Sequence, residues 1–442
     1  MLDLRGKRVM VVGLGISGQA AAQFLAGQGA KLVLVDKNPN LDRGAIPSGE
    51  VHLGPEDPAW LTGVDLVVTS PGVPRDSVLL TRAVAAKIPV MGEIELASRF
   101  LSAPITAITG TNGKSTVTML LGEMLKASGM RTFVGGNLGT PLVKAVGLVL
   151  DALVVEVSSF QLEWIQHFRP RVGIYLNLSD DHFDRYQGLE DYGAAKARVF
   201  ENQDGSDWAI LNRDDANVWK LAREVRSQVF SFGMLPSGET PAIWPEEKSL
   251  KFEMRSRKGQ ISLAGFRLPG QHNVANAMAA SAAALAMFVD TGPIERALRS
   301  FRGLPHRLEV VREADGVTWI DDSKGTNVGA VVEALDAVAA PVVLLAGGLD
   351  KGGEYAPLLG PFRTKVKVAI LFGAAREKMR DALAGTPTTF QLVPTLKDAV
   401  ELAARIAKQG DTVLLSPACA SFDQFKDYAE RGNVFQELVR AL

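Results

Sequence analysis

Short runs of apolar and β-branched residues alternate along this chain with longer segments of helical character. Ten such runs predict strands: RVMVV, KLVLV, DLVVT, ITAIT, ALVVEV, VGIYLN, WAILN, PVVLLAG, VKVAILFG and DTVLLSP. Most of the intervening segments are amphipathic or alanine-rich and long enough for a helix. Continuous apolar strands separated by helices are typical of parallel sheets that are covered on both faces. The chain is therefore predicted to have an α/β fold.

The length of 442 residues suggests about three domains, at one domain per roughly 150 residues. Two seams interrupt the pattern, at PVMGEIELASRF (89–100) and SFRGLPHRLE (300–309). We expect domains at 1–93, 94–302 and 303–442. Between positions 228 and 268 the runs VFSF, AIW, SLKFEM and ISLAGF alternate more strongly. They predict antiparallel strands at the edge of the central sheet.

Composition excludes several classes of protein. The net charge of −1 provides no basic field for nucleic acid. A single cysteine, Cys419, rules out a disulfide framework and fits a reducing cytoplasm. The longest apolar stretch, at 277–289, is too short to span a bilayer and predicts a buried helix. The first residues do not form a signal peptide. We expect a cytoplasmic protein without nucleic-acid partners or membrane insertion.

The first unit contains a dinucleotide fingerprint. RVMVVGLGISG places Gly13, Gly15 and Gly18 in G-x-G-x-x-G spacing after an apolar run, and KLVLVD ends at Asp36. This spacing is typical of NAD-binding enzymes. However, a glycine turn at a helix N-terminus binds any pyrophosphate, so the motif alone does not identify the ligand. A dehydrogenase and a protein that binds another diphosphate both remain open here.

The second unit contains the strongest chemical signal, a phosphate-binding loop. The strand ITAIT leads into Gly110, Thr111, Asn112, Gly113, Lys114, Ser115 and Thr116, and a helical segment follows. Glycines allow backbone N–H groups to approach phosphate, Lys114 can reach the terminal phosphates, and the Ser115 hydroxyl can ligate Mg²⁺. The loop is G-x-x-G-K-S, shorter than the usual G-x-x-x-x-G-K. The alternative is a turn that caps a helix beside an exposed lysine.

Acidic residues follow the next two predicted strands. Glu156 ends ALVVE, where a carboxylate can hold Mg²⁺ opposite the loop, or can simply be a solvated strand end. The following strand leads into a charged cluster of Asp180, Asp181, His182, Asp184 and Arg185. His182 could reach a second metal or a substrate oxygen, although such clusters are often solvated loops. From residue type alone, Lys196 is expected to be an exposed surface lysine.

The third unit has polar clusters at or just past its strand ends, where doubly wound sheets bind ligands. They contain Arg307; Asp321, Asp322, Ser323, Lys324 and Thr326; Asp350 and Lys351; and Ser421. Arg307 and Lys324 suit phosphate, whereas Lys351 and Ser421 suit a small carboxylate. Before the alanine-rich helix, Asn273 and Asn276 could cap the helix or contact a nucleotide.

These motifs together resemble those of the Mur ligases of peptidoglycan synthesis. The matches are VGLGISG, TSPGVP, ITGTNGKST, VGGNLG, VEVSSFQLE, DDHFDRY, AAKARV, GQHNVANA, GLPHRLEVV, IDDSKGTN and SPACASFDQFK. Folylpolyglutamate synthases share the GTNGKS loop, whereas SSFQLE, GLPHR and SPACASFDQF are more specific to the D-glutamate-adding member. The resemblance implies Rossmann-like first and third domains around a P-loop ATPase-type central domain, with a mainly parallel sheet and a small antiparallel one.

The resemblance also implies a reaction. ATP would phosphorylate the L-alanyl carboxylate of UDP-N-acetylmuramoyl-L-alanine, and the amine of D-glutamate would attack the acyl phosphate to form an amide. Another ATP-dependent amide ligase, such as a folylpolyglutamate synthase or a different Mur ligase, is the alternative. An NAD-dependent dehydrogenase would leave the Lys114 loop unexplained, and a nucleotide sensor would bind ATP without turnover. The chain is expected to act as a monomer.

Site residues are implied by the same resemblance. The nucleotide-sugar substrate would contact Gly13, Ile16, Ser17, Gly18, Asp36, Lys37, Asn38, Ser70, Asn137 and His182. ATP would contact the phosphate loop together with Asn273, Arg307, Asp322 and Lys324. D-glutamate would contact Thr326, Lys351, Ser421 and Phe422. One Mg²⁺ would lie at Ser115 and Glu156, and a second at His182 and an N-carboxylated Lys196. Leu349, Asp350 and Tyr428 depart from the relatives, so contacts of the amino-acid pocket near them are not fixed.

Overall fold

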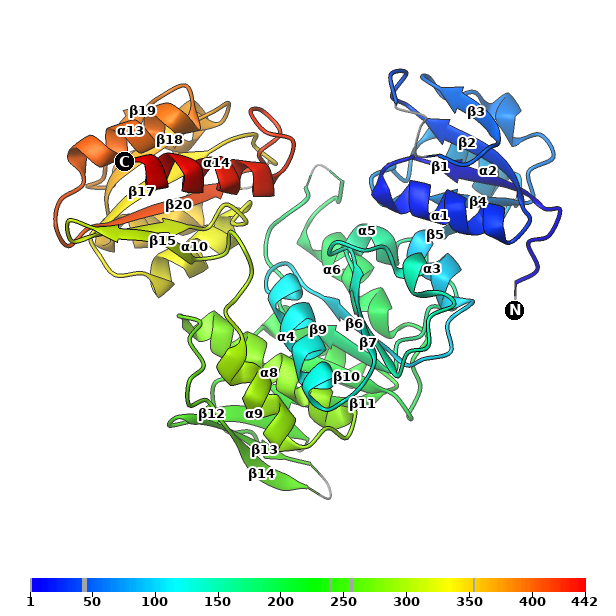
Figure 1. Ribbon diagram of the computed structural model, residues 1–442, viewed down its shortest axis with the longest axis horizontal. Helices are drawn as coiled ribbons and strands as arrows, with labels where there is room; N and C mark the ends of the chain where they lie inside the picture. Colours follow the sequence, from blue (N-terminus) through cyan, green and yellow to red (C-terminus); the bar gives the residue numbers. More distant parts are fainter. Residues whose placement is uncertain (1, 42–45, 184, 239–240, 255–256, 353) are drawn as a thin grey trace.

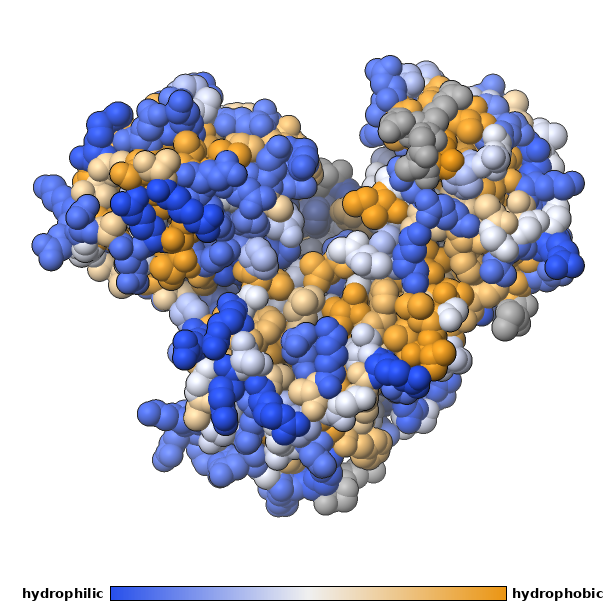
Figure 2. Space-filling model, viewed as in Figure 1, coloured by the Kyte–Doolittle hydropathy of each residue, from blue (hydrophilic) through white to orange (hydrophobic). Residues whose placement is uncertain are grey.

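The computed structural model describes residues 2–41, 46–183, 185–238, 241–254, 257–352 and 354–442. Three sheets form three lobes, with the first (blue) and the third (yellow to red) standing on opposite sides above the second (Figure 1). The space-filling view shows an open cleft between the two upper lobes (Figure 2). The predicted α/β class is confirmed. Among the described residues, no helix has both the length and the apolar character needed to cross a bilayer.

The first lobe is a five-stranded parallel sheet. Its strands are β1 (Arg8–Val12), β2 (Lys31–Asp36), β3 (Glu50–Leu53), β4 (Leu66–Thr69) and β5 (Val90–Gly92). Its helices are α1 (Ile16–Gly27), η1 (Pro58–Leu61) and α2 (Val78–Ala85). The strand order β3-β2-β1-β4-β5 puts the ends of β1 and β4 side by side. Helix α1 covers one face of the sheet and α2 the other, each over its own apolar cluster.

The second lobe is a nine-stranded sheet covered on both faces. Its strands are β6 (Ile105–Thr109), β7 (Thr132–Gly136), β8 (Ala152–Glu156), β9 (Val172–Tyr175), β10 (Trp208–Asn212), β11 (Gln228–Phe232), β12 (Ala242–Glu246), β13 (Ser249–Glu253) and β14 (Lys258–Ser262). Its helices are α4 (Lys114–Ala127), η2 (Leu142–Ala145), α5 (Ser159–Leu162), α6 (Leu189–Ala197), η3 (Arg198–Phe200), α7 (Ala216–Trp219), η4 (Lys220–Arg223), α8 (Gln271–Ala286) and α9 (Thr291–Ser300). The order β14-β13-β12-β11-β10-β9-β6-β8-β7 places β6 between β8 and β9. Residues 277–286 of the alanine-rich stretch lie in α8 and are buried, as predicted, whereas Phe288 beyond the helix is exposed.

One part of the strand prediction was wrong. VFSF and AIW were expected to run antiparallel, but β11 is parallel to both β10 and β12. Among the described residues of this sheet, β13 alone runs against the other strands, because it pairs antiparallel with β12 on one side and with the edge strand β14 on the other. The helical crossover of α7 and η4 between β10 and β11 returns the chain to the starting end, which favours parallel pairing. Alternation of apolar residues does not encode strand direction, so the sequence pattern could not distinguish these cases.

The third lobe is a six-stranded sheet. Its strands are β15 (Glu309–Ala314), β16 (Val317–Asp321), β17 (Val342–Gly347), β18 (Val366–Phe372), β19 (Thr389–Leu392) and β20 (Thr412–Ala418). Its helices are α10 (Val328–Ala337), η5 (Ala356–Leu358), α11 (Leu359–Thr364), α12 (Arg376–Ala382), α13 (Leu396–Ile406) and α14 (Tyr428–Ala441). The order is β15-β16-β20-β17-β18-β19, and only the β15–β16 pair is antiparallel.

Helix α3 (Glu93–Ser98) joins the first two lobes. Ile94 and Ala97 pack into the central core, whereas Leu96 packs into the core of the first lobe. Between these contacts lies Glu95, whose side chain is fully buried. Its carboxylate accepts hydrogen bonds from the backbone N–H groups of residues 166–168 and from Arg99 Nε. Burial opposes ionisation of Glu95, but these bonds outweigh it and lower the pKa.

Replacing Glu95 is therefore expected to destabilise the junction. Glu95→Ala leaves buried N–H groups unpaired and should lower the free energy of unfolding by on the order of 3 kcal/mol, measured by urea denaturation at pH 7. Because the folded-state pKa is lowered, the carboxylate stabilises the fold above the pKa of the unfolded chain. The difference in the free energy of unfolding between the wild-type protein and Glu95→Ala should therefore decrease as the pH falls below about 4.

The control is Glu123→Ala. In the wild-type protein the Glu123 carboxylate forms an exposed ion pair with Lys126 at 3.1 Å. Such a pair contributes less than about 1 kcal/mol. An equal decrease in the free energy of unfolding in Glu95→Ala and Glu123→Ala would contradict the proposed stabilising role of Glu95 at the junction.

Candidate functional site

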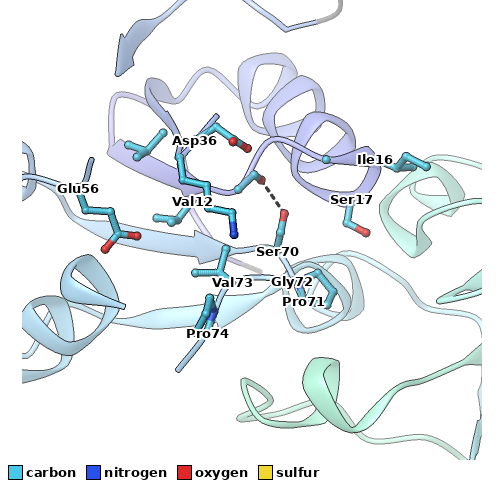
Figure 3. A pocket seen from close by; sticks show the side chains of 14 residues that line it. Val12, Ile16, Ser17, Asp36, Glu56, Ser70, Pro71, Gly72, Val73 and Pro74 are labelled. Atoms are coloured by element: carbon cyan, nitrogen blue, oxygen red, sulfur yellow. Dashed lines mark hydrogen bonds between the residues drawn. The ribbon is translucent and has the colours of Figure 1, made fainter. Parts of the chain in front are cut away.

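A cavity of about 420 Å³ lies at the ends of β1 and β4 in the first lobe (Figure 3). Its lining includes six of the residues assigned above to the nucleotide sugar: Gly13, Ile16, Ser17, Asp36, Lys37 and Ser70. Helix α1 begins at Ile16, and its N-cap Gly15 has no side chain to occupy the free N–H groups. These N–H groups suit the oxygens of a diphosphate.

Two glycines shape this cavity. Gly13 has a φ of +83°, and its carbonyl accepts a hydrogen bond from Ser70 Oγ at 2.6 Å, drawn in Figure 3. Gly18 does not line the cavity, because it packs against that carbonyl, and a Cβ there would lie 1.8 Å from the oxygen. Asp36 accepts from the N–H groups of Leu14 and Asn38. Gly18 is therefore buried behind the cavity wall, whereas Asn38 is exposed and does not line the cavity.

The phosphate loop follows β6 and leads into α4. Gly113, the residue before the helix, has a φ of +82°, a conformation that favours glycine. The Lys114 ammonium donates to the carbonyls of Gly110 and Thr111, at 2.8 and 2.7 Å. Burial lowers the pKa of Lys114, whereas the charges of Glu156 and Asp181 oppose the shift. The alternative of an exposed lysine beside a capping turn does not hold, because Lys114 is folded back over its own loop.

Hard oxygen ligands lie beside this loop. Ser115 Oγ donates to one oxygen of Glu156 at 2.6 Å, and Asn137 Nδ2 donates to the other at 2.8 Å. Glu156 is 3% exposed, so it is not a solvated strand end. In the described part of the chain, the buried Thr116 hydroxyl has no hydrogen-bond partner. A hydroxyl and a carboxylate, such as those of Ser115 and Glu156, are ligand types that Mg²⁺ accepts.

Lys196 is buried, so the expectation of an exposed lysine, made from residue type alone, was wrong. It is 1% exposed at the end of α6, and its ammonium donates to the Gly110 carbonyl at 2.8 Å. It also lies over the Tyr192 ring, 4.3 Å from the centroid. Burial and the charge of Lys114 lower its pKa well below the ordinary value. Tertiary packing of α6 against the loop decides this burial, because a helix of low amphipathicity gives no sequence signal for it.

The charged loop after β9 reaches the same region. Asp181 is buried and forms an ion pair with Lys351 of the third lobe at 3.3 Å. His182 has a φ of +58° and packs against the Phe160 ring. Asp180 is exposed, Arg185 pairs with Glu163, and Asp184 lies outside the described residues. Of this cluster, Asp181 and His182 line the cavity between the second and third lobes.

That cavity has a volume of about 430 Å³ and combines both lobes. From the second lobe it is lined by Thr111, Asn112, Gly113, Lys114, Ser115, Asn137, Glu156, Asp181 and His182. From the third it is lined by Arg307, Lys324, Thr326, Asn327, Lys351, Ala420, Ser421, Phe422, Asp427 and Tyr428. Of the residues expected at the nucleotide and amino-acid sites, Gly110, Thr116, Asn273 and Asp322 do not line it, and neither does Lys196.

Two of the residues that do not line this cavity, Asp322 and Asn273, are buried near it. Asp322 accepts from Ser416 Oγ at 2.7 Å, and burial raises its pKa to about 7. Asn273 donates to the carbonyl of Pro269 at 2.6 Å and accepts from Asn276. Asn276 lines a neighbouring cavity of about 240 Å³, which also includes Gly113 of the phosphate loop.

Several residues that shape the site were not identified as candidates from the sequence. Asn177 accepts from the N–H of Asn112 and so supports the phosphate loop. Asn327 donates to Asn112 Oδ1 at 3.2 Å, across the two lobes. Glu333 lies 3.8 Å from Arg307 and lines the neighbouring cavity. Asn177 could have been found from the sequence, because it lies at the end of a predicted strand. Asn327 resembles an ordinary helix N-cap and Glu333 an ordinary acidic residue inside a helix, so neither carries such a signal.

The three departures from relatives fall at different places. Asp350 does not line this cavity; it bonds Tyr355 and Lys378 and lines a small adjoining cavity that also includes Asp181 and Lys351. Leu349 is exposed and pairs through its backbone with Ala420. Tyr428 lines the cavity, and its hydroxyl accepts from Lys324 Nζ at 3.0 Å.

Comparisons with known proteins cover nearly the whole chain. Residues 7–92 match the Mur ligase MurD-like N-terminal domain, 108–284 the Mur ligase middle domain, and 306–419 the Mur ligase glutamate ligase domain. UDP-N-acetylmuramoylalanine–D-glutamate ligases from Geotalea uraniireducens and Geotalea daltonii are 46% and 45% identical. Each alignment covers 100% of this chain and 99% of the relative.

Solved structures share the fold at lower identity. MurF ligase from Thermotoga maritima, solved with ADP, has a TM-score of 0.62 at 18% identity, over 100% of this chain and 97% of that one. UDP-N-acetylmuramate-alanine ligase MurC from the same organism has a TM-score of 0.61 at 20% identity, over 98% and 99%. With three domain models matched in order and full-length relatives above 40% identity, the chain belongs to the Mur ligase family.

Proposed function

We propose that this protein joins D-glutamate to UDP-N-acetylmuramoyl-L-alanine with the consumption of ATP, in peptidoglycan synthesis. One observation carries the proposal: a single cavity combines the phosphate-loop lysine Lys114 and the Glu156 carboxylate with Lys351 and Ser421 of the third lobe. A separate cavity in the first lobe suits a nucleotide diphosphate. The similarity to full-length D-glutamate ligases supports the choice of substrates.

The chemical difficulty is electrostatic. A carboxylate must attack the γ-phosphorus of ATP, so two anions have to come together. Lys114 would hold the terminal phosphates, and Arg307 and Lys324 would approach the nucleotide from the third lobe. The carboxylate forms a bond to phosphorus as the bond to ADP breaks. The D-glutamate amine then attacks the acyl carbon, loses a proton and displaces phosphate. Lys351, Ser421, Thr326 and Phe422 would hold D-glutamate for this attack.

Ser115 and Glu156 would hold one Mg²⁺, since their oxygens are already paired beside the loop. His182 and Lys196 would hold a second, with Lys196 as the N-carboxylated anion. When bound, the metal ions would neutralise charge on the phosphates. N-carboxylation requires a neutral amine: the Lys196 nitrogen attacks the carbon of CO₂ and releases a proton, leaving a carbamate. The lowered pKa of this buried lysine supports such a reaction.

Each of the three lobes would bind a different part of the substrates. Residues 1–93 would bind the UDP part of the acceptor, 94–302 would bind ATP, and 303–442 would bind D-glutamate and contribute further contacts to ATP. In the first domain, Ile16, Ser17 and the Asp36–Asn38 turn would face the nucleotide, and Asn137 would meet its sugar end beside Glu156. Asn273 and Asp322 would act from the walls around ATP. We further propose a cytoplasmic monomer.

Amino-acid selectivity tests the proposal directly. Phosphate release with UDP-N-acetylmuramoyl-L-alanine, ATP and Mg²⁺ should require D-glutamate and remain at background with L-glutamate or diaminopimelate. Release with diaminopimelate or with a folate acceptor would favour another ligase of the superfamily. ATP binding without any phosphate release would favour a sensor.

The role of Lys114 predicts a large kinetic defect. Lys114→Ala should lower kcat by at least about 100-fold in the D-glutamate-dependent phosphate assay, because a charge aimed at the transferring phosphate is lost. Lys126→Ala is the matched control, since Lys126 lies on the same helix and its ammonium donates to exposed Glu123. Undiminished ligation by Lys114→Ala would remove the proposed mechanism.

The carbamate predicts chemical rescue. Lys196→Ala should lose on the order of 100-fold in kcat and regain part of it in acetate or formate, which can replace the missing anion. Lys196→Arg keeps the positive charge but cannot be N-carboxylated, and it should be equally inactive. A fully active Lys196→Ala, or an active Lys196→Arg, would eliminate the carbamate.

A further inference from the structure

One face of α14 contacts the loops that bear the proposed ATP and D-glutamate ligands of the third lobe. The face consists of Tyr428, Arg431, Gly432 and Gln436, spaced i, i+3, i+4 and i+8 along the helix. Only Tyr428 lines the cavity; Arg431, Gly432 and Gln436 lie behind it. We propose that these three are positioning residues, which hold Arg307, Lys324 and Ser421 in place for ligand binding. The proposal rests on the ligand roles assigned above.

Gly432 contacts the segment that bears Arg307. The ring of His306 lies directly against it: a Cβ at position 432 would be 2.2 Å from His306 Nδ1. His306 is buried, with a left-handed φ of +62°, and its Nδ1 bonds Asp321 at 2.7 Å. Its carbonyl accepts from the N–H of Lys324 at 3.0 Å. Displacing the ring therefore moves both Arg307 and Lys324.

A glycine inside a helix is unfavourable unless something requires it. Alanine is a better helix former at an interior position. Here the His306 ring fills the space that a methyl group would take, so Gly432 permits a close approach between α14 and the Arg307 segment. Gln436, one turn later, donates to Glu309 and Asp321 at 3.0 and 2.9 Å, which fixes the carboxylates around the same ring.

Arg431 connects two other segments. Its Nε donates to Ser323 Oγ and its second terminal nitrogen to the Ser323 carbonyl, at 3.0 and 2.8 Å. The remaining nitrogen donates to the carbonyls of Cys419 and Ala420, at 3.2 and 3.4 Å. Ser323 precedes Lys324, and Ala420 precedes Ser421. One guanidinium therefore fixes the spacing between a nucleotide segment and an amino-acid segment.

The burial of Arg431 indicates that it does more than stabilise the domain. Its side chain is fully buried, yet its hydrogen bonds end on neutral oxygens of Ser323, Cys419 and Ala420. A buried cation without a directly bonded carboxylate is costly. Burial accordingly lowers its pKa to about 10. The site's need for a fixed geometry explains this buried guanidinium, because its planar group donates in several directions and so can hold two loops at a fixed distance.

The test compares ligands in full-length variants. Gly432→Ala should raise the ADP dissociation constant, measured by calorimetry without other substrates, by about tenfold, because Arg307 and Lys324 are displaced. The KM for D-glutamate should change by less than about twofold. Gly360→Ala, in helix α11 of the same lobe with no atom near the added methyl group, is the matched control and should bind ADP normally.

Two further variants separate positioning from stability. Arg431→Lys keeps the charge but cannot join both loops, so the KM for D-glutamate should also rise by about tenfold. In a His306→Ala background, Gly432→Ala should cause no additional loss of ADP affinity, because the clash is gone. If Gly432→Ala fails to fold by circular dichroism, Gln436→Met takes its place and should weaken ADP binding in the same way.

Normal ADP affinity in both Gly432→Ala and Gln436→Met would overturn the inference. So would an equal rise of all KM values in Gly432→Ala and Arg431→Lys, which would indicate a general loss of stability. Wild-type protein that binds ADP but does not ligate D-glutamate would instead contradict the proposed function and leave the ADP test valid.

Discussion

The side-chain nitrogens of two lysines, Lys114 and Lys196, donate to one carbonyl oxygen, that of Gly110. The charge of the candidate site depends on this arrangement. Lys114 comes from the helix after β6, and Lys196 from the helix that follows the β9 loop. Charging both lysines is costly, because burial disfavours the ammonium form and two like charges this close repel each other, and the pKa of each is lowered as a result. Glu156 and Asp181 offset part of that cost. The positive charges of Lys114, Arg307 and Lys324, which line the cavity, make the site suitable for a polyanion such as a nucleoside triphosphate.

The strand order makes this charge arrangement possible. Because β6 lies between β8 and β9, the phosphate loop, Glu156 and the Asp181 loop all emerge at neighbouring strand ends. Adjacent parallel strands present their carboxyl ends at one edge, where open sheets bind ligands. The third lobe then closes the site from the other side through Lys351 and Asn327, which contact Asp181 and Asn112.

In the proposed function, the first lobe would use similar electrostatics, at a helix N-terminus, for a different ligand. Its glycine turn and free helix N-terminus resemble those of NAD enzymes, because both ligands contain a diphosphate. Two contacts join this lobe to the central lobe: Arg185 donates to the carbonyl of Pro71 at the cavity wall, and Lys144 donates to Gln23 on α1. The cavity is thus tied to the phosphate-binding lobe, as a substrate that must reach both sites requires.

The sequence by itself determined the strand and helix alternation, the two phosphate-binding turns and the acidic strand ends, because these depend on local periodicity and on glycine geometry. Short or edge strands such as β3, β7 and β19 had weaker patterns and were not predicted, and the direction of β11 was predicted wrongly. Only the tertiary structure decided the burial of Lys196, the pairing of Asp181 with Lys351, and the packing of Gly432 against His306. These features depend on contacts between residues far apart in the chain, and side-chain burial there is set by packing that no single segment encodes.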